Sequence, residues 1–378
     1  MATRIYLIAG EASGDLHGGN LIKALRELSA DVECRAWGGE HMAAAGATVV
    51  KHYRELAFMG FWEVVKNLPA IWQNLQFCRR EIEAFRPDAI VLIDYPGFNL
   101  RIARWAKRRG YRVIYYISPQ LWAWHASRVR AIKRDVDQLL VILPFEVDFY
   151  QQYGVEAIWV GHPLLDAIPA RRAVESNGII ALLPGSRQQE VRRILPVMLS
   201  VTPFFPEYRF VIAAAPSLPR ELFHPYLAAY PKVELRFGDT YGVLQEAQAA
   251  LVKSGTSTLE AALIGVPQVV CYAGNSFSYA IAKRLVRVSY ISLVNLVLQR
   301  PLVRELIQGD LNTALLCRAL SEILNAEQAK AIREGYEELR QRLGGAGASK
   351  RAAQHILHFL MQRKERDLGS NVFRGLHK

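Results

Sequence analysis

The stretch "RIYLIAGEASGDLHGGNLIKALREL", residues 4–28, decides the fold that the sequence predicts. An apolar run, a glycine-rich loop and an amphipathic pattern follow one another, which indicates a buried strand, a tight turn and a helix. Nucleotide-binding folds place a phosphate loop at this point, and a phosphate needs bare backbone N–H groups without negative charge nearby. This loop carries Glu11, Asp15 and His17 instead. We therefore expect it to bind hydroxyl groups, such as those of a sugar, rather than a phosphate.

The same alternation continues along the chain. Further strands are predicted in the first half at "VECRAWG", "AIVLIDY", "RVIYYIS" and "QLLVILPF", and from Gly178 onward at "IIALLPG", "YRFVIAA", "VELRFG", "AALVKSG" and "PQVVCYA". Continuous apolar strands separated by helices indicate parallel sheets covered on both faces. The predicted fold class is α/β, with two doubly wound, Rossmann-like domains facing a central cleft and ligands at the carboxyl ends of the strands.

A change of pattern at residues 160–178, "VGHPLLDAIPARRAVESNG", marks the predicted domain boundary, because prolines and polar residues interrupt the alternation. We expect an N-terminal domain at residues 1–165, a C-terminal domain at residues 166–345 and a C-terminal helix at residues 346–378.

The charge balance narrows the class of partner. The 378 residues contain 47 Lys and Arg against 35 Asp and Glu, a net charge of +12 that favours anionic partners such as nucleic acid, phosphorylated metabolites or anionic lipid. No nucleic-acid motif accompanies the charge, so we expect no nucleic acid. Four scattered cysteines indicate neither a zinc site nor a disulfide framework, which fits a reducing cytoplasm. We expect no signal peptide and no membrane-spanning segment.

Two loops of the second half have the parts of a nucleotide pocket. In "LLPGSRQQEV", Gly185 and Ser186 form a turn that lets backbone approach a phosphate, and Arg187 can fork onto its oxygens. An ordinary strand-to-helix turn with a surface arginine has the same pattern. In "VKSGTSTLEAALIG", a small polar turn opens a helix, and Glu260 lies one turn into it, where it either reaches a ribose or is a capping or solvated residue. The turn consists of Ser254, Gly255 and Thr256.

Seven motifs together resemble the lipid-A-disaccharide synthase family, and the donor loop resembles those of GT-B glycosyltransferases. The motifs are "AGEASGDLHGGNLIKAL", "IDYPGFNLRIARWAK", "YYISPQLWAWHASRVRAIK", "VGHPLLD", "LLPGSRQQEV", "SGTSTLEAALIGVPQVV" and "ISLVNLV". The resemblance runs from the first strand to about Leu360.

The resemblance implies a GT-B-like fold and an inverting hexosyl transfer. UDP-2,3-diacylglucosamine would donate its sugar to the 6-hydroxyl of 2,3-diacylglucosamine 1-phosphate (lipid X), giving the β-1,6 disaccharide of lipopolysaccharide biosynthesis and UDP. It further implies a peripheral enzyme at the cytoplasmic side of a Gram-negative inner membrane, without cofactor or metal. The C-terminal helix would cross back to an N-terminal domain, its own or that of a partner in a homodimer.

Inverting transfer needs a base for the acceptor hydroxyl and positive charge for the leaving diphosphate. The functional aspartate of the family falls on Asp94, at the end of "AIVLID"; a helix cap is the alternative. We expect Glu11 and His17 to join Asp94 as catalytic groups. His17 would bind the acceptor phosphate, pair with an acid or simply begin the helix. Asp15 would bind the acceptor or cap the helix.

Three further residues are predicted to bind the acceptor, and a fourth to shape the donor site. Trp124 and His125 in "QLWAWHASR" suit a sugar face or an acyl chain, and Arg128 suits the 1-phosphate. Core packing and a solvated basic face are the alternatives. Asn295 falls on the family motif "ISLVNLV" and would shape the donor site. Asp135 and Asp137 form a DxD pair, but they precede a strand rather than follow one, so we predict no metal site.

The segment at residues 58–80, "FMGFWEVVKNLPAIWQNLQFCRR", is the predicted membrane contact. Its apolar residues recur at helical spacing, with aromatic side chains and several basic residues. A core helix has a similar pattern. The predicted contacts are Phe58, Phe61, Trp62, Val65, Leu68, Trp72 and Leu75.

Two other functions would explain part of these sequence features. A UDP-sugar epimerase has the same two-domain pocket but needs no acceptor and no lipid-facing segment. A non-catalytic nucleotide-binding protein at a membrane surface has no need of Asp94.

Overall fold

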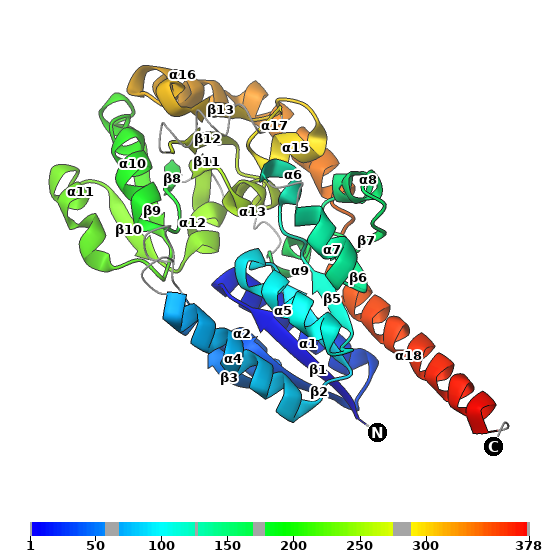
Figure 1. Ribbon diagram of the computed structural model, residues 1–378. Coiled ribbons are helices and arrows are strands. Elements are labelled where there is room, and N and C mark those ends of the chain that lie inside the picture. The colour runs from blue at the N-terminus through cyan, green and yellow to red at the C-terminus, as the bar shows by residue number, and fades with distance from the viewer. Residues whose placement is uncertain (1, 57–67, 125–127, 169–177, 275–288, 376–378) are drawn as a thin grey trace. The chain divides into compact units, whose positions relative to one another are not determined.

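The computed structural model describes residues 2–56, 68–124, 128–168, 178–274 and 289–375. The chain forms two compact units, Met1–Asp166 with Gly344–Lys378, and Ala167–Leu343 (Figure 1). Each unit contains one sheet with helices on both faces, so the predicted α/β class with two Rossmann-like domains is confirmed. No helix in the described ranges is both long and apolar enough to cross a membrane.

The sheet of the first unit is entirely parallel, in the order β3-β2-β1-β4-β5-β6-β7. Two of these strands, β3 and β7, had no counterpart among the predicted strands. The bounds are β1 Thr3–Ala9, β2 Val32–Gly38, β3 Thr48–His52, β4 Ala89–Ile93, β5 Val113–Tyr116, β6 Gln138–Val141 and β7 Ala157–Trp159.

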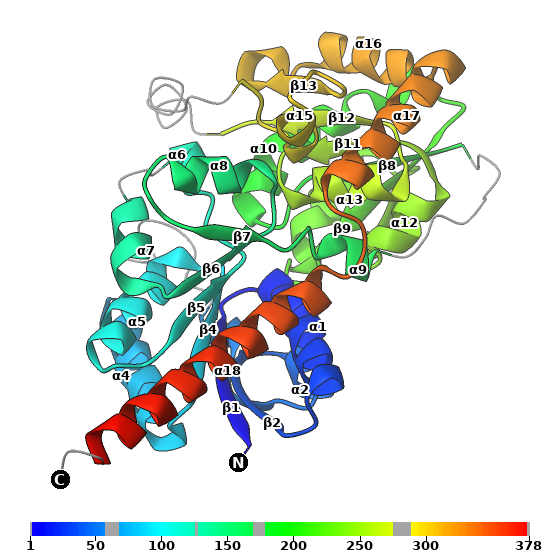
Figure 2. The ribbon, with the colours of Figure 1, turned by 90° about the vertical axis from the view of Figure 1, so that its right-hand side faces the viewer.

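Helices cover both faces of this sheet. Helices α1 (Ala12–Leu28) and α18 (Ala348–Gly375) pack on one face and against each other, so the C-terminal helix lies beside the helix of the opening stretch (Figure 2). The other face carries α4 (Leu68–Phe85), α5 (Pro96–Arg108), α7 (Val129–Asp135) and α8 (Phe145–Gln151). The short helices α2 (Glu40–Ala44), α6 (Leu121–Trp124) and α9 (Leu164–Ala167) lie in the connections.

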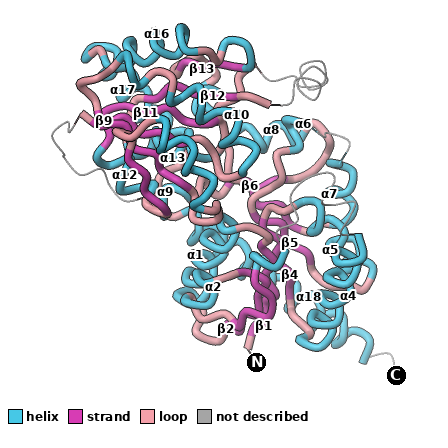
Figure 3. The backbone as a smooth tube through the Cα atoms, turned by 90° about the vertical axis from the view of Figure 1, so that its left-hand side faces the viewer, coloured by secondary structure: helices cyan, strands magenta, loops and turns pink. Residues whose placement is uncertain are grey.

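The second unit repeats the plan with the strand order β10-β9-β8-β11-β12-β13, again all parallel. Figure 3 draws its strands in magenta and its helices in cyan. The strands are β8 Ile179–Leu183, β9 Arg209–Ala214, β10 Glu234–Phe237, β11 Ala247–Lys253, β12 Gln268–Tyr272 and β13 Arg304–Ile307. The helices are α10 Gln188–Leu199, α11 His224–Ala229, α12 Thr240–Glu246, α13 Thr256–Ile264, α15 Leu293–Leu298, α16 Thr313–Leu324 and α17 Ala326–Arg342.

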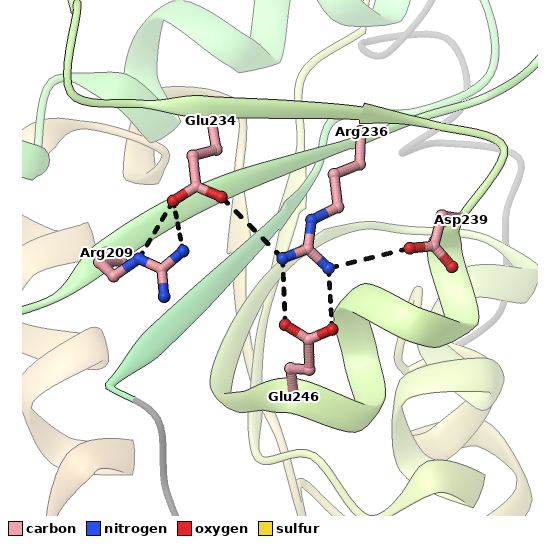
Figure 4. A network of polar contacts seen from close by, with 5 residues as sticks. All are labelled: Arg209, Glu234, Arg236, Asp239 and Glu246. Atoms are coloured by element: carbon pink, nitrogen blue, oxygen red, sulfur yellow. Dashed lines mark hydrogen bonds and ion pairs between the residues drawn. The ribbon is translucent and has the colours of Figure 1, made fainter.

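An ion-pair network ties the edge strand β10 to α12 (Figure 4). Arg236 donates to both carboxylate oxygens of Glu246 at 2.9 and 3.0 Å, while Glu234 accepts two bonds from Arg209 of β9. Asp239 lies 3.8 Å from Arg236. The bidentate geometry fixes the direction of the edge strand more than it stabilises the fold, because these side chains are partly solvated.

Most of the predicted glycine-rich loop is the first part of α1, and its glycine Gly19 brings α1 close to α2. A Cβ on Gly19 would lie 2.8 Å from the carbonyl oxygen of His41, which is main chain and cannot move alone. Asp15 is 1% exposed, and its carboxylate accepts hydrogen bonds from the N–H groups of Gly39 (2.6 Å), His41 (3.0 Å) and Met42 (3.1 Å). The predicted acceptor role of Asp15 is therefore wrong, because this carboxylate caps α2 from inside the protein.

The close approach at Gly19 predicts a specific stability loss. Gly19→Ala should lower the free energy of unfolding by about 1–3 kcal/mol, since the added methyl group forces the backbone of α2 to shift. Gly97→Ala is the matched control, because a Cβ at this position would have no other atom within 4 Å and the backbone suits alanine. Urea unfolding of both variants measures the difference, and an equal effect of the two substitutions would contradict this packing.

Candidate active site

Asp94 directly follows β4, as the sequence predicts, and its backbone has an unusual shape. Asp94 and Tyr95 both have left-handed conformations, with φ of 44° and 48°, before α5 begins at Pro96. Tyr95 is the N-cap residue of α5, and no side chain caps this helix end, so the alternative of a capping role for Asp94 fails. Asp94 keeps part of its surface exposed to solvent.

The neighbouring strand brings an acidic partner. Ala9 of β1 pairs with Ile93 of β4, so Glu11 and Asp94 follow the same edge of the sheet. Desolvation of the carboxylate by surrounding protein atoms, and then the negative charge of Glu11, raise the pKa of Asp94 to about 6. The backbone N–H of Tyr95 opposes this rise and lowers the pKa of Asp94. Asp94 is thus unprotonated near pH 7 while keeping more basicity than an ordinary aspartate.

His17, the third predicted catalytic residue, is buried. It is 6% exposed, and burial lowers its pKa to about 4, although Asp166 partly opposes that shift. His162, also buried, has a pKa lowered to about 3 by burial and by His17. The His17 imidazole is therefore neutral near pH 7. Its roles as a catalytic group or in binding the acceptor phosphate stay predictions. The Asp166 carboxylate, which raises the pKa of His17, also accepts hydrogen bonds from the N–H groups of Gly347 and Ser349 at the start of α18.

The aromatic motif after β5 is only partly described. Helix α6 ends at Trp124, whose side chain lies outside the described part, as does His125; Arg128 is exposed where α7 begins. Before α6, Ser118 donates to the carboxylate of the buried Glu146 at 3.1 Å, which fixes the segment.

The acids of the DxD pair bind cationic side chains and main chain of their own unit. Asp135 binds Arg134, and Asp137 pairs with Lys107 and accepts the N–H of Val113 at 3.0 Å. Among the residues that the structure describes, no group of three or more His, Cys, Asp or Glu could hold a metal ion.

In the second unit, β8 and β11 are neighbours, so the two predicted donor loops follow the same edge of the sheet. Gly185 has φ of 117°, and the N–H of Ser186 donates to Glu190 at 3.2 Å. Glu190 also binds Lys253 at 2.8 Å and lies 3.7 Å from Arg187. Lys253 ends β11 and was not predicted, although it directly precedes the quoted "SGTSTLE" motif. The two donor loops therefore bring the cations Arg187 and Lys253 to the same carboxylate, Glu190.

Of the other predicted donor residues, some are exposed to a ligand and others already bind groups of the protein. Thr256 is exposed at the first position of α13, and Gly255 is its N-cap residue. Glu260 accepts a hydrogen bond from Tyr241 at 3.0 Å, and burial raises its pKa. The Ser254 hydroxyl donates to the carbonyl of Ile291 at 2.9 Å.

Asn295 is fully occupied by its own unit. It is 1% exposed, its amide donates to the carbonyl of Val303 (2.8 Å) and to Glu305 (2.9 Å), and its oxygen accepts the N–H of Val303 (3.0 Å). Its predicted role in shaping the donor site therefore acts through the main chain that it holds. Asn295 and Glu305 hold the segment that begins α15, because Glu305 also accepts the N–H groups of Ile291 and Ser292.

The predicted membrane segment needs one correction. Phe58, Phe61, Trp62 and Val65 lie outside the described residues, as does the side chain of Leu68. In α4, Trp72 is 62% exposed, whereas Leu75 is 8% exposed and packs in the core with Cys78 and Ile82. Leu75 is therefore a core residue, and it and Trp72 do not share one apolar face.

The chain is similar to known proteins over most of its length. Residues 5–359 match the family model described as lipid-A-disaccharide synthetase. The lipid-A-disaccharide synthase of Geobacter metallireducens is 38% identical over 96% of this chain and 98% of its own, and that of Syntrophus aciditrophicus is 39% identical over 92% and 96%.

Solved structures show the same fold at low identity. The UDP-GlcNAc 2-epimerase of Neisseria meningitidis, bound to UDP-GlcNAc, superimposes with a TM-score of 0.65 at 14% identity, covering 94% of this chain and 100% of that one. The glycotransferase of kitacinnamycin gives a TM-score of 0.64 at 18% identity, over 94% and 99%.

The acidic pair predicts a coupled titration. Glu11→Gln removes a negative charge beside Asp94, so the pKa of Asp94 should fall from about 6 toward its usual value. Carboxyl-carbon NMR of aspartate-labelled protein measures the shift, with Asp94→Asn to assign the signal. Glu27→Gln, at the exposed far end of α1, is the control and should leave the pKa unchanged. An unchanged pKa in Glu11→Gln would show that the two carboxylates do not interact.

Proposed function

The chain belongs to the lipid-A-disaccharide synthetase family, and from this premise we propose how its residues divide the work of the reaction. The enzyme transfers diacylglucosamine from its UDP donor to lipid X, 2,3-diacylglucosamine 1-phosphate, and releases UDP in lipid A biosynthesis. Neither a UDP-sugar epimerase nor a non-catalytic nucleotide-binding protein is favoured by these relatives.

Asp94 is the general base in our proposal. It takes the proton of the 6-hydroxyl of the acceptor while that oxygen attacks the anomeric carbon and UDP leaves from the opposite face. A general base works best when its pKa lies near the working pH, and a pKa of about 6 meets that condition. Glu11 keeps the pKa of Asp94 raised and accepts hydrogen bonds from sugar hydroxyls. The single observation that carries this proposal is the raised pKa of Asp94, beside Glu11 at the same edge of the sheet.

The second unit holds the donor in the same proposal. Arg187 and Lys253 neutralise the leaving diphosphate, and the N–H groups that begin α13 bind its oxygens. Before the donor arrives, Glu190 holds both cations, so the diphosphate exchanges one anionic partner for another. Glu260 binds the ribose. These cations replace a metal, so the transfer should not need one.

The lipid chains of both substrates suggest contact with an anionic membrane surface. Trp72 is exposed on α4, and Arg80 is exposed two turns later on the same helix. Aromatic and basic side chains together suit the headgroup region. Peripheral binding to the inner membrane, and a homodimer, stay predictions.

The test of the function is UDP release from UDP-2,3-diacylglucosamine in detergent, with and without lipid X and with EDTA in parallel. We expect release that requires lipid X and persists with EDTA. Asp94→Asn should slow it by about 10²–10⁴-fold, the usual contribution of a general base. Release without acceptor would point to a hydrolase or epimerase, and full activity of Asp94→Asn would remove the base from the proposal.

The exposed aromatic of α4 gives a separate prediction. Trp72→Ser should reduce cosedimentation with vesicles that contain anionic lipid, because it removes an apolar side chain from the contact surface. Phe204→Ser is the matched control, since Phe204 is 65% exposed and lies in the second unit. Equal binding of the two variants would argue against a membrane role for α4.

A further inference from the structure

The backbone at Asp94 has a shape that the start of a helix does not require. An N-cap residue is ordinarily extended, and left-handed non-glycine residues are uncommon. Here Asp94 and Tyr95 are both left-handed in succession. Conformations of this kind persist only where surrounding contacts enforce them.

Two buried side chains supply those contacts. The amide of Asn99 donates to the carbonyl of Asp94 at 2.7 Å and to that of Ile93 at 3.2 Å. The hydroxyl of Tyr115 donates to the same Asp94 carbonyl at 2.6 Å. Both donor residues are fully buried, so their polar groups depend on these bonds for partners.

The two donors reach the Asp94 carbonyl from different elements. Asn99 lies in the first turn of α5, and its own N–H donates to the carbonyl of Tyr95 at 3.0 Å. Tyr115 lies on β5, which pairs with β4. Two donors on one carbonyl fix the orientation of the peptide that follows Asp94. That peptide contains the Tyr95 N–H, which lowers the pKa of the Asp94 carboxylate.

We propose that Asn99 and Tyr115 are positioning residues for the transfer, because their bonds to the Asp94 carbonyl hold its carboxylate in the direction of the acceptor hydroxyl. This inference rests on the proposed role of Asp94 as the base. Neither residue touches the reacting atoms. Their effect on the rate passes through Asp94 alone.

The test uses Tyr115→Phe, which removes one hydroxyl and keeps the ring. We expect kcat to fall by about 10- to 100-fold with an unchanged KM for lipid X, since a small displacement of a catalytic group has this effect. Tyr150→Phe is the matched control. Tyr150 is equally buried in the same unit, but its hydroxyl binds Ser118 at 2.7 Å, so its kcat should stay near that of the unaltered enzyme.

A double variant separates positioning from general destabilisation. If Tyr115 acts through Asp94, then Tyr115→Phe combined with Asp94→Asn should be no slower than Asp94→Asn alone. A multiplied loss in the double variant would overturn the inference, as would an unchanged kcat in Tyr115→Phe. Asn99→Ala provides the same test through the second donor if Tyr115→Phe unfolds. Full activity of Asp94→Asn would instead defeat the base assignment on which the inference rests.

Discussion

The parallel pairing of β1 with β4 at the centre of the first sheet is the constraint on which the site depends. Both strands are buried on both faces, so neither can carry a charged side chain along its buried length. Polar chemistry is therefore confined to the residues that follow the strands. The pairing of Ala9 with Ile93 brings the residues after both strands to one edge, where Glu11 raises the pKa of Asp94.

The same principle places the donor loops in the second unit. Because β8 pairs with β11, Gly185 and Lys253 lie at the ends of adjacent strands, and Glu190 joins the cations of both loops. The internal carboxylate keeps two positive charges compensated where the diphosphate is proposed to bind. At the donor loops, ion pairs with Glu190 compensate the positive charges of Arg187 and Lys253. In the first unit, the negative charge of Glu11 raises the pKa of Asp94.

Much of the fold was predictable because apolar strands and glycine-rich turns are local signals. The central strands, the α/β class and the position of Asp94 all follow from short patterns in the sequence. The edge strands β3, β7 and β13 were missed because they are short and only partly buried. Asn99 and Tyr115 carry no local signal of their role, since it arises from bonds to one carbonyl oxygen in the folded chain.

A polar side chain in a motif can bind the protein's own backbone instead of a ligand, as Asp15 and Asn295 do. Asp15 binds three N–H groups of the α2 region, and Asn295 binds the main chain at Val303. Leu75 matched the spacing of an exposed stripe, but the buried stripe of α4 has the same period. Spacing alone does not say which face of a helix meets the core.

The central claim is that Asp94 removes the acceptor proton with a pKa raised by its neighbours. The pH dependence of kcat/KM for the unaltered enzyme tests it directly, because this quantity reports the ionisation of the free enzyme. Since the unprotonated carboxylate is the active form, the account predicts that kcat/KM falls about tenfold per pH unit below a midpoint near pH 6. A midpoint near that of an ordinary aspartate, or no acid limb at all, would contradict it.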